Sequence, residues 1–235
     1  MFQRVFITAL VAGVFAGVLA FSVQRIKVVP LIHQAEVYET AAIARPPHDH
    51  AGSEHSRVAE KVAVGKAWEP EEGFERTAYT LLADIVAGTG FSLLLSGLMA
   101  LAGIFGHQLD FHRGLLWGAA GFVAFTLAPS LGLPPELPGM EATDLSLRQA
   151  WWVATVLATA LGLAIMAFRP EPALRVAGFG LLILPHLIGA PHSTEHGGSV
   201  PAELAAQFAT ASIAAAGLFW IVLGGAIGWL YRRLG

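Results

Sequence analysis

Apolar residues fall into six long stretches, which are separated by shorter polar segments. The stretches cover residues 5–23, 77–105, 114–131, 150–168, 173–189 and 204–230. A helix needs roughly 20 apolar residues to cross the hydrocarbon core of a bilayer, and each stretch is close to that length or longer. Because lipid cannot hydrogen-bond an exposed backbone, such segments form helices that pack together. The pattern therefore predicts an all-α protein, a polytopic transmembrane helical bundle of about six helices.

Composition supports a membrane protein. Charged residues make up 13% of the chain, against about 25% in soluble proteins. The length of 235 residues suits a single membrane domain over residues 1–235. The net charge is only −3, so neither nucleic acid nor an anionic lipid surface is an obvious partner. The apolar stretches make membrane lipid the expected surrounding. Because the chain has no cysteine, disulfides, thiolate metal sites and cysteine nucleophiles are excluded.

The distribution of arginine predicts the orientation, because basic residues concentrate in short cytoplasmic loops. Two short loops on one side, 132–149 and 190–203, hold only Arg148. Both termini are therefore expected in the cytoplasm, and the segment 25–76 is expected to be an extracytoplasmic loop that begins with a short helix over 28–40. A cleaved signal peptide over the first stretch stays open as an alternative, and it would leave five spans. When both termini are in the cytoplasm, the arginines on the cytoplasmic side are Arg4, Arg113, Arg169, Arg175, Arg232 and Arg233.

Histidine gathers on the outer side of this arrangement, which holds seven of the nine. The first outer loop carries three within eight residues, together with two carboxylates, and the last outer loop carries two at i, i+4 spacing. Imidazole suits zinc, copper, iron, nickel and, by the same borderline character, cobalt. The outer face is therefore predicted to bind a divalent metal ion, with a solvated loop and a chance cluster as the alternative. The seven are His33, His48, His50, His55, His186, His192 and His196.

Asp84 is the one clear acid inside a predicted span, about two turns from its outer end. Ionisable groups at membrane depth are costly, so they usually face a partner or a cavity and are functional candidates. An aspartate bonded to a neighbouring helix is the structural alternative. Pro185 has no N–H to donate, so the fifth helix is expected to kink or end there and to direct His186 away from a regular helix surface. Asp84 and His186 are therefore predicted to lie on the route of the ion.

Small residues recur at four-residue spacing in four of the stretches, which allows helix backbones to approach closely. No phosphate-binding loop of the G-x-x-x-x-G-K-[ST] type occurs, and no nucleophile and base stand out as a pair. The chain is therefore not expected to hydrolyse ATP or to be an enzyme, and no bound organic cofactor is expected. The small-residue pairs are Gly13/Gly17, Gly114/Gly118, Ala158/Gly162 and Gly224/Gly228.

Four segments together resemble the CbtA family, whose members are predicted subunits of a bacterial cobalt transporter. The resemblance covers nearly the whole chain, including the histidine-containing loop and the segment 196–204. It implies cobalt uptake across the bacterial inner membrane by a multi-pass protein. It also implies a partner, CbtB, a small single-helix membrane protein with histidines of its own. The segments that carry the resemblance are 28–39, 113–122, 128–139 and 184–191.

Two classes of function follow. The first is a membrane subunit of an uptake system for Co²⁺, or for Ni²⁺ or Zn²⁺, that gathers the ion at the outer histidines and offers the carboxylate of Asp84 within. The second is a non-transporting accessory subunit that packs beside another membrane complex, as a homo-oligomer or a hetero-oligomer. A membrane enzyme with a bound metal is the weakest alternative, because no recognisable base or nucleophile accompanies the histidines.

Overall fold

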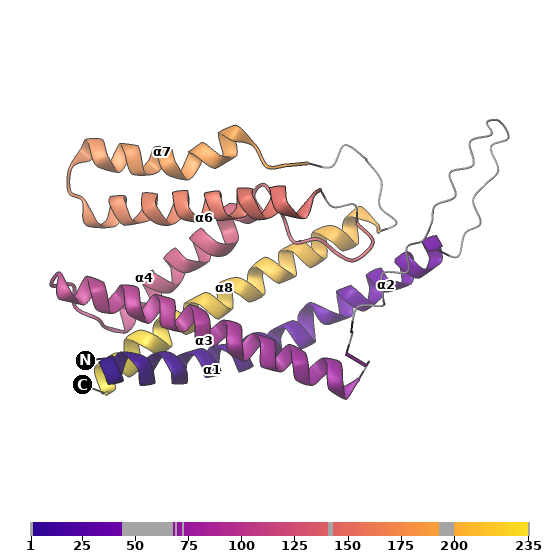
Figure 1. The fold of residues 1–235 in the computed structure, drawn as a ribbon, viewed down its shortest axis with the longest axis horizontal. Coiled ribbons are helices and arrows are strands. Elements are labelled where there is room, and N and C mark those ends of the chain that lie inside the picture. Colours follow the sequence, from indigo (N-terminus) through magenta and orange to yellow (C-terminus); the bar gives the residue numbers. More distant parts are fainter. Residues whose placement is uncertain are drawn as a thin grey trace.

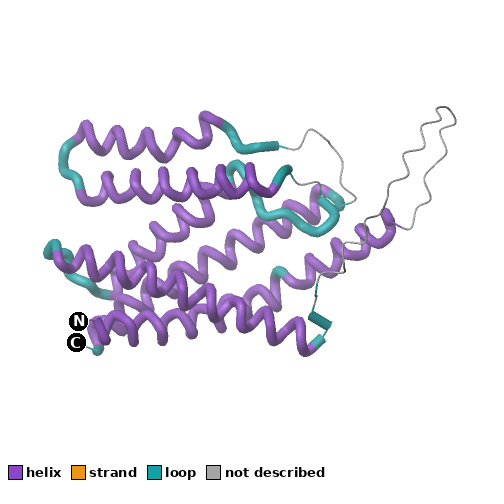
Figure 2. The backbone as a smooth tube through the Cα atoms, viewed as in Figure 1, coloured by secondary structure: helices purple, strands orange, loops and turns teal. Residues whose placement is uncertain are grey.

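Helices account for nearly all of the part of the chain that the structure describes (Figure 1). The computed structural model describes residues 2–43, 68, 70–71, 73–140, 143–192 and 200–234, and no strand occurs among them. Figure 2 shows the helices running back and forth between two ends, where the described loops lie. The elements are α1 (Phe2–Lys27), α2 (Val29–Ile43), α3 (Phe74–Ile104), α4 (Phe111–Phe122), the π-helical segment η1 (Val123–Leu127), α5 (Ala128–Ser130), α6 (Leu145–Phe168), α7 (Pro172–Ile188) and α8 (Ala202–Arg233).

Each of the six predicted stretches falls almost entirely within these helices. Four helices, α1, α3, α6 and α8, are long and apolar enough to cross a membrane. The third stretch forms α4, η1 and α5, which follow one another without a break, and the fifth forms α7, a shorter apolar helix of 17 residues. The all-α class is thus confirmed, with four membrane-spanning candidates. The count of six spans and the orientation remain predictions.

The two ends of the described chain meet at one end of the bundle (Figure 1). The guanidinium of Arg4 in α1 donates to the carbonyl oxygen of Tyr231 in α8, with an Nε–O distance of 2.8 Å. The same guanidinium lies over the Tyr231 ring, 3.9 Å from its centroid. An even number of crossings brings the ends of a chain together in this way. The first stretch is therefore a packed helix of the bundle, with a buried face on α3 and α8.

Glycine lets α1 and α3 touch backbone to backbone. A Cβ atom on Gly13 would lie 2.5 Å from the Cα of Thr89, and one on Gly17 would lie 2.6 Å from the carbonyl oxygen of Asp84. From the other side, a Cβ on Gly88 would lie 2.6 Å from the carbonyl oxygen of Gly13. No side chain fits at these positions, so the predicted packing role of Gly13 and Gly17 is confirmed.

In two further helix pairs, glycine also lets the backbones touch. In the α4–α8 pair, a Cβ on Gly114 would lie 2.3 Å from the carbonyl oxygen of Gly224, and one on Gly228 would lie 2.3 Å from the carbonyl oxygen of Asp110. In the α6–α7 pair, a Cβ on Gly162 would lie 2.5 Å from the carbonyl oxygen of Gly178. Close approach of this kind increases van der Waals contact, which drives association of helices in lipid.

Aromatic rings join the pairs across the middle of the bundle. Phe91 of α3 lies 5.0 Å from Trp220 of α8 between ring centroids, and Trp220 lies 5.4 Å from Phe125 of η1. Phe125 in turn lies 6.2 Å from Trp152 of α6. Trp220 is 3% exposed and sits over Gly121, where a Cβ would collide with its ring. These rings fill the space where α3, α8, η1 and α6 meet.

Two prolines near helix ends are accommodated differently. Before Pro129 the backbone widens into η1, where the N–H of Ala128 donates to the carbonyl oxygen of Val123, so the helix passes the missing proline donor without ending. Helix α7 was expected to kink or end at Pro185; it does not end there, because it continues to Ile188, and the kink stays a prediction. The helix stops at Gly189, which has a positive φ of 88° and donates its N–H to the carbonyl oxygen of Pro185. A proline so near the end removes one helical hydrogen bond and leaves the last turn intact.

Capping aspartates extend two helices beyond the apolar stretches. Asp110 accepts a hydrogen bond from the backbone N–H of Arg113 at 2.9 Å, so α4 begins at Phe111. Asp144 accepts from the backbone N–H of Ser146 at 2.9 Å, so α6 begins at Leu145.

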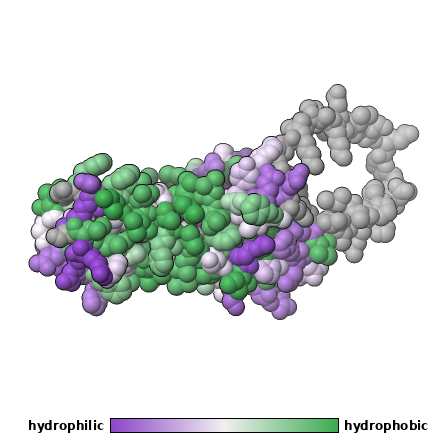
Figure 3. Space-filling model, turned by 90° about the horizontal axis from the view of Figure 1, so that it is seen from below, coloured by the Kyte–Doolittle hydropathy of each residue, from purple (hydrophilic) through white to green (hydrophobic). Residues whose placement is uncertain are grey.

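The predicted outer helix over 28–40 is present as α2. Figure 3 shows an apolar band between two hydrophilic ends, the surface pattern that a bilayer covers.

The glycine contacts predict opposite effects of one methyl group at two positions. Gly224→Ala places a Cβ 2.2 Å from the carbonyl oxygen of Gly114 and should destabilise the bundle by about 1–3 kcal/mol. Gly97→Ala meets nothing within 4 Å and should be neutral or stabilising by up to about 1 kcal/mol. Thermal unfolding of the two variants in the same detergent measures the difference. Equal melting temperatures would show that α4 and α8 do not pack in this way.

Candidate functional site

Asp84 lies where α1 and α3 press together. Its Oδ1 accepts a hydrogen bond from Nε2 of Gln24 in α1 at 3.2 Å. Its Oδ2 is buried and has no hydrogen-bond partner among the described residues. Gly17 stands opposite the backbone of Asp84, so α1 comes close enough for Gln24 to reach the carboxylate. The structure therefore bears out the alternative of a carboxylate bonded to a neighbouring helix, but that bond uses only one of its oxygens.

A buried carboxylate oxygen without a donor is a chemically open position. Burying a polar group without a partner is costly, and an isolated buried charge is costlier. A proton or a bound cation removes that cost, since either one satisfies the oxygen that Gln24 leaves open. The pair of Gln24 and Asp84 can therefore hold a proton or a metal ion at membrane depth. The geometry is compatible with the predicted role of Asp84.

His186 occupies a different part of the bundle. It lies in the last turn of α7, and its ring is 6.0 Å from that of Trp151 in α6, in an edge-to-face arrangement. Helix α7 packs on α6, whereas α3 packs mainly on α1. Figure 1 shows α7 and α1 on opposite sides of the molecule. The structure therefore does not bring Asp84 and His186 together, although both belong to apolar helices.

The remaining predicted ligands fall at or beyond the limits of the described residues. His192 follows α7 and is exposed, next to Pro191, whose carbonyl oxygen accepts a hydrogen bond from the Thr143 hydroxyl at 3.4 Å. His196 lies outside the described residues, and so do His48, His50 and His55. Within the described ranges, no group of three or more His, Asp or Glu side chains is arranged to hold a metal ion.

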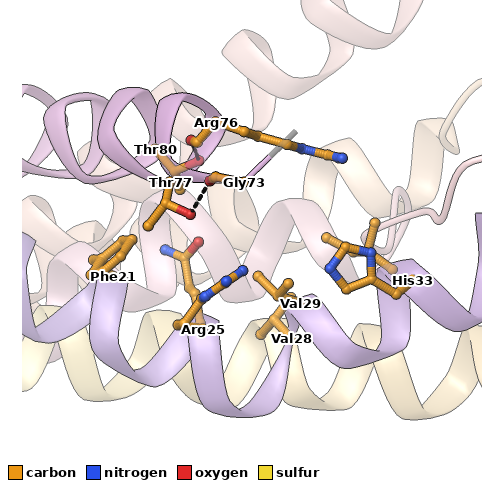
Figure 4. A pocket seen from close by; sticks show the side chains of 11 residues that line it. Phe21, Arg25, Val28, Val29, His33, Gly73, Arg76, Thr77 and Thr80 are labelled. Atoms are coloured by element: carbon orange, nitrogen blue, oxygen red, sulfur yellow. Dashed lines mark hydrogen bonds between the residues drawn. The ribbon is translucent and has the colours of Figure 1, made fainter. Parts of the chain in front are cut away.

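A second polar cluster joins α2 to α3. Oε2 of Glu36 lies 3.0 Å from Nδ1 of His33, and its Oε1 lies 3.3 Å from a guanidinium nitrogen of Arg76. The hydrogen bond with His33, and secondarily the charge and hydrogen bond of Arg76, hold the pKa of Glu36 below its usual 4.5. Beside this cluster a cavity of about 370 Å³ opens between α1, α2 and α3 (Figure 4), and Gln24 is among its lining residues.

Sequence reasoning missed Gln24 and Trp151. Gln24 follows the first apolar stretch directly, so the hydropathy pattern assigns it to the loop, although α1 continues to Lys27. Trp151 lies at the start of the fourth apolar stretch, where hydropathy gives it no special role, yet its Nε1 is buried without a hydrogen-bond partner in the described part of the chain. One signal in the sequence could have indicated the Gln24–Asp84 pair. Gln24 is an amide side chain within one helical turn of the first apolar stretch, and the next apolar stretch carries an acid.

Comparison with protein families decides the identity of the chain. The model of the CbtA family, described as a probable cobalt transporter subunit, matches residues 2–232. The chain belongs to the CbtA family. No curated protein and no solved structure matches it significantly. The match spans nearly the whole chain, so α1 to α8 together form the CbtA unit.

CbtA membership narrows the chemistry. The family description names cobalt as the transported ion and the protein as a subunit, so the chain acts in a complex. A transporter subunit is not a class of enzyme. With four helices of membrane-spanning length and composition, this CbtA member has the apolar helices of a membrane protein.

The Glu36 cluster predicts an acid-sensitive contact between α2 and α3. Because the pKa of Glu36 is lowered in the folded state, its ion pair stabilises the fold above about pH 4.5 and is lost as the pH falls through the lowered pKa. Spin labels at Val37→Cys and Ala78→Cys, in a chain without native cysteine, report the distance. The distribution should broaden on acidification and should already be broad at pH 7 in Glu36→Gln.

Glu203→Gln provides the control, since Glu203 is exposed in the first turn of α8 and its carboxylate accepts a hydrogen bond from Gln207 of the same helix. Its labelled variant should behave like the parent at both pH values. A parent distribution that stays narrow well below pH 4.5, or a Glu36→Gln variant that is still acid-sensitive, contradicts the assignment to Glu36.

Proposed function

We propose that this protein is the membrane subunit of a bacterial cobalt uptake system, which gathers the ion at an outer histidine-bearing face. The family match over residues 2–232 carries the proposal. Four apolar helices of sufficient length support a multi-pass position in the inner membrane. Co²⁺ is the proposed substrate, and imidazole and carboxylate ligands would also accept Ni²⁺ or Zn²⁺.

The proposed orientation places both termini in the cytoplasm and α2 outside. The arginine asymmetry of the loops supports it, as does the meeting of the two chain ends at Arg4 and Tyr231. The segment 25–76 is then the outer histidine-containing loop, and His186, His192 and His196 lie on the same side. The proposed partner is CbtB, which the family resemblance implies.

Asp84 is the proposed acceptor of the ion within the membrane. Its Oδ2 is buried and lacks a donor in the described structure, while Gln24 holds Oδ1. At this position a dication would bind the carboxylate of Asp84. The neutral amide of Gln24 lies beside it, and its carbonyl oxygen is a second potential ligand. Because His186 lies on α7, the outer histidines act in capture rather than as direct neighbours of Asp84.

Replacing the charge of Asp84 should impair transport without unfolding the protein. Asp84→Asn keeps the shape and an acceptor for Gln24, yet removes the charge that a dication requires. Uptake of radioactive Co²⁺ into cells or vesicles, with the partner subunit present, should fall by roughly tenfold or more, the factor for a loss of about 1.4 kcal/mol. Glu203→Gln is the matched control, because it removes one exposed carboxylate near the outer end of α8.

The histidines should divide into two groups by their effect on uptake. His186→Phe keeps an aromatic ring against Trp151 and removes both nitrogen ligands, so uptake should fall while the melting temperature stays near that of the parent. Joint replacement of His48, His50 and His55 by Ala should matter chiefly when metal is scarce. The prediction is contradicted if the triple loop variant loses all uptake while the Asp84→Asn variant takes up Co²⁺ like the parent.

An accessory role is the second candidate, and the same uptake assay separates it. The backbone contacts of the α1–α3 and α4–α8 pairs suit a protein whose task is to pack and assemble. If the partner alone transports cobalt at the full rate, and this protein changes only the yield of the complex, the accessory role holds. Transport that requires this chain and the Asp84 carboxylate supports the uptake role.

A further inference from the structure

The cavity between α1, α2 and α3 has a composition that differs from that of a metal site. Its wall combines apolar side chains with two arginines and a histidine, and its volume is about 370 Å³. Figure 4 shows Arg25 extending from α1 toward Gly73 and Thr77, while Arg76 extends from α3 toward the side where His33 lies. The lining residues are Phe21, Gln24, Arg25, Val28, Val29, Ile32, His33, Gly73, Arg76, Thr77 and Thr80.

The charges around the cavity are unequally compensated. Arg76 and His33 both contact the carboxylate of Glu36, at 3.3 Å and 3.0 Å. Arg25 has no ion pair with any described residue, and it is exposed. The excess positive charge of the cavity therefore lies at Arg25. A guanidinium binds phosphate through parallel N–H donors, whereas it repels a bare dication.

The position of the cavity matches the boundary of a membrane. Phe21 and Gln24 belong to the last two turns of α1, just before Arg25 and Lys27 end the helix. Figure 3 shows the apolar band giving way to hydrophilic side chains at both ends of the bundle. Phospholipid phosphates lie at this level, with acyl chains on the apolar side. Phe21, one turn before Arg25 in α1, forms the part of the apolar wall on the bilayer side, and Val28 and Ile32 form the part next to α2.

We propose that this cavity binds the phosphate-bearing headgroup of an anionic phospholipid from the leaflet at the α2 end. Arg25 donates to the phosphate, and Thr77 and Thr80 line the opposite wall, where their hydroxyls already donate to the carbonyl oxygens of Gly73 and Arg76. The first part of an acyl chain follows Phe21. Such a lipid bridges α1, α2 and α3 and so fixes the angle at which α2 leaves the membrane.

A matched pair of variants separates a specific site from general attraction to anionic lipid. Arg25→Gln and Lys27→Gln each remove one positive charge from the same helix end, but only Arg25 lines the cavity. Purified protein is titrated in detergent with short-chain phosphatidylglycerol, and retained lipid is counted by native mass spectrometry. Arg25→Gln should weaken binding about tenfold, while Lys27→Gln should stay within about twofold of the parent.

Further binding measurements identify the ligand. Short-chain phosphatidylcholine should bind much more weakly than phosphatidylglycerol, and inorganic phosphate at the same concentration should not displace the lipid. Circular dichroism of the lipid-free variants verifies that both are folded, and Arg25→Lys should retain part of the binding. Equal binding of phosphatidylcholine, equal losses in the two glutamine variants, or binding of inorganic phosphate with no preference for lipid would each overturn the proposal.

Discussion

Backbone-to-backbone contact at glycine is the constraint on which the rest of the bundle depends. Lipid tails are as apolar as leucine, so apolar side chains alone give helices little reason to associate in a membrane. Glycine removes the side chain and lets dispersion forces act between backbones, at Gly17 against α3 and at Gly114 against α8. The α1–α3 contact also determines the site, because Gln24 reaches Asp84 only when the two helices lie this close.

The pairs of helices separate the polar groups of the protein. Asp84 belongs to the α1–α3 pair and His186 to the α6–α7 pair, and the rings of Phe91, Trp220 and Phe125 pack together where α3, α8 and η1 meet. An ion captured at His186 would have to pass that aromatic layer, or travel along the outer surface, before it reached Asp84. For the proposed uptake function, this separation makes capture at His186 and transfer to Asp84 two distinct steps.

Much of the fold follows from the sequence, because stretches of about 20 apolar residues have few alternatives to helix in lipid. Glycine spacing identified the contact faces of the helices. It did not predict which faces pair, Gly114 with Gly224 and Gly162 with Gly178, because any two small-residue faces can pack closely. The site was predictable only in part. Asp84 stood out as an intramembrane acid, but its partner Gln24 lay just beyond the hydropathy boundary, and the distance between Asp84 and His186 depends on pairing that local sequence does not encode.

The hydrogen bond from Arg4 to the Tyr231 carbonyl has a consequence for how the protein is made. The two residues are 227 positions apart, so α1 meets one of its packing neighbours only after α8 has been synthesised. Until then the small-residue face of α1, including Ala12 and Ala16, is only partly covered by α3. The contact between α1 and α3 can therefore form earlier in synthesis than the contact between α1 and α8, and the packing of α1 is complete only when α8 is in place.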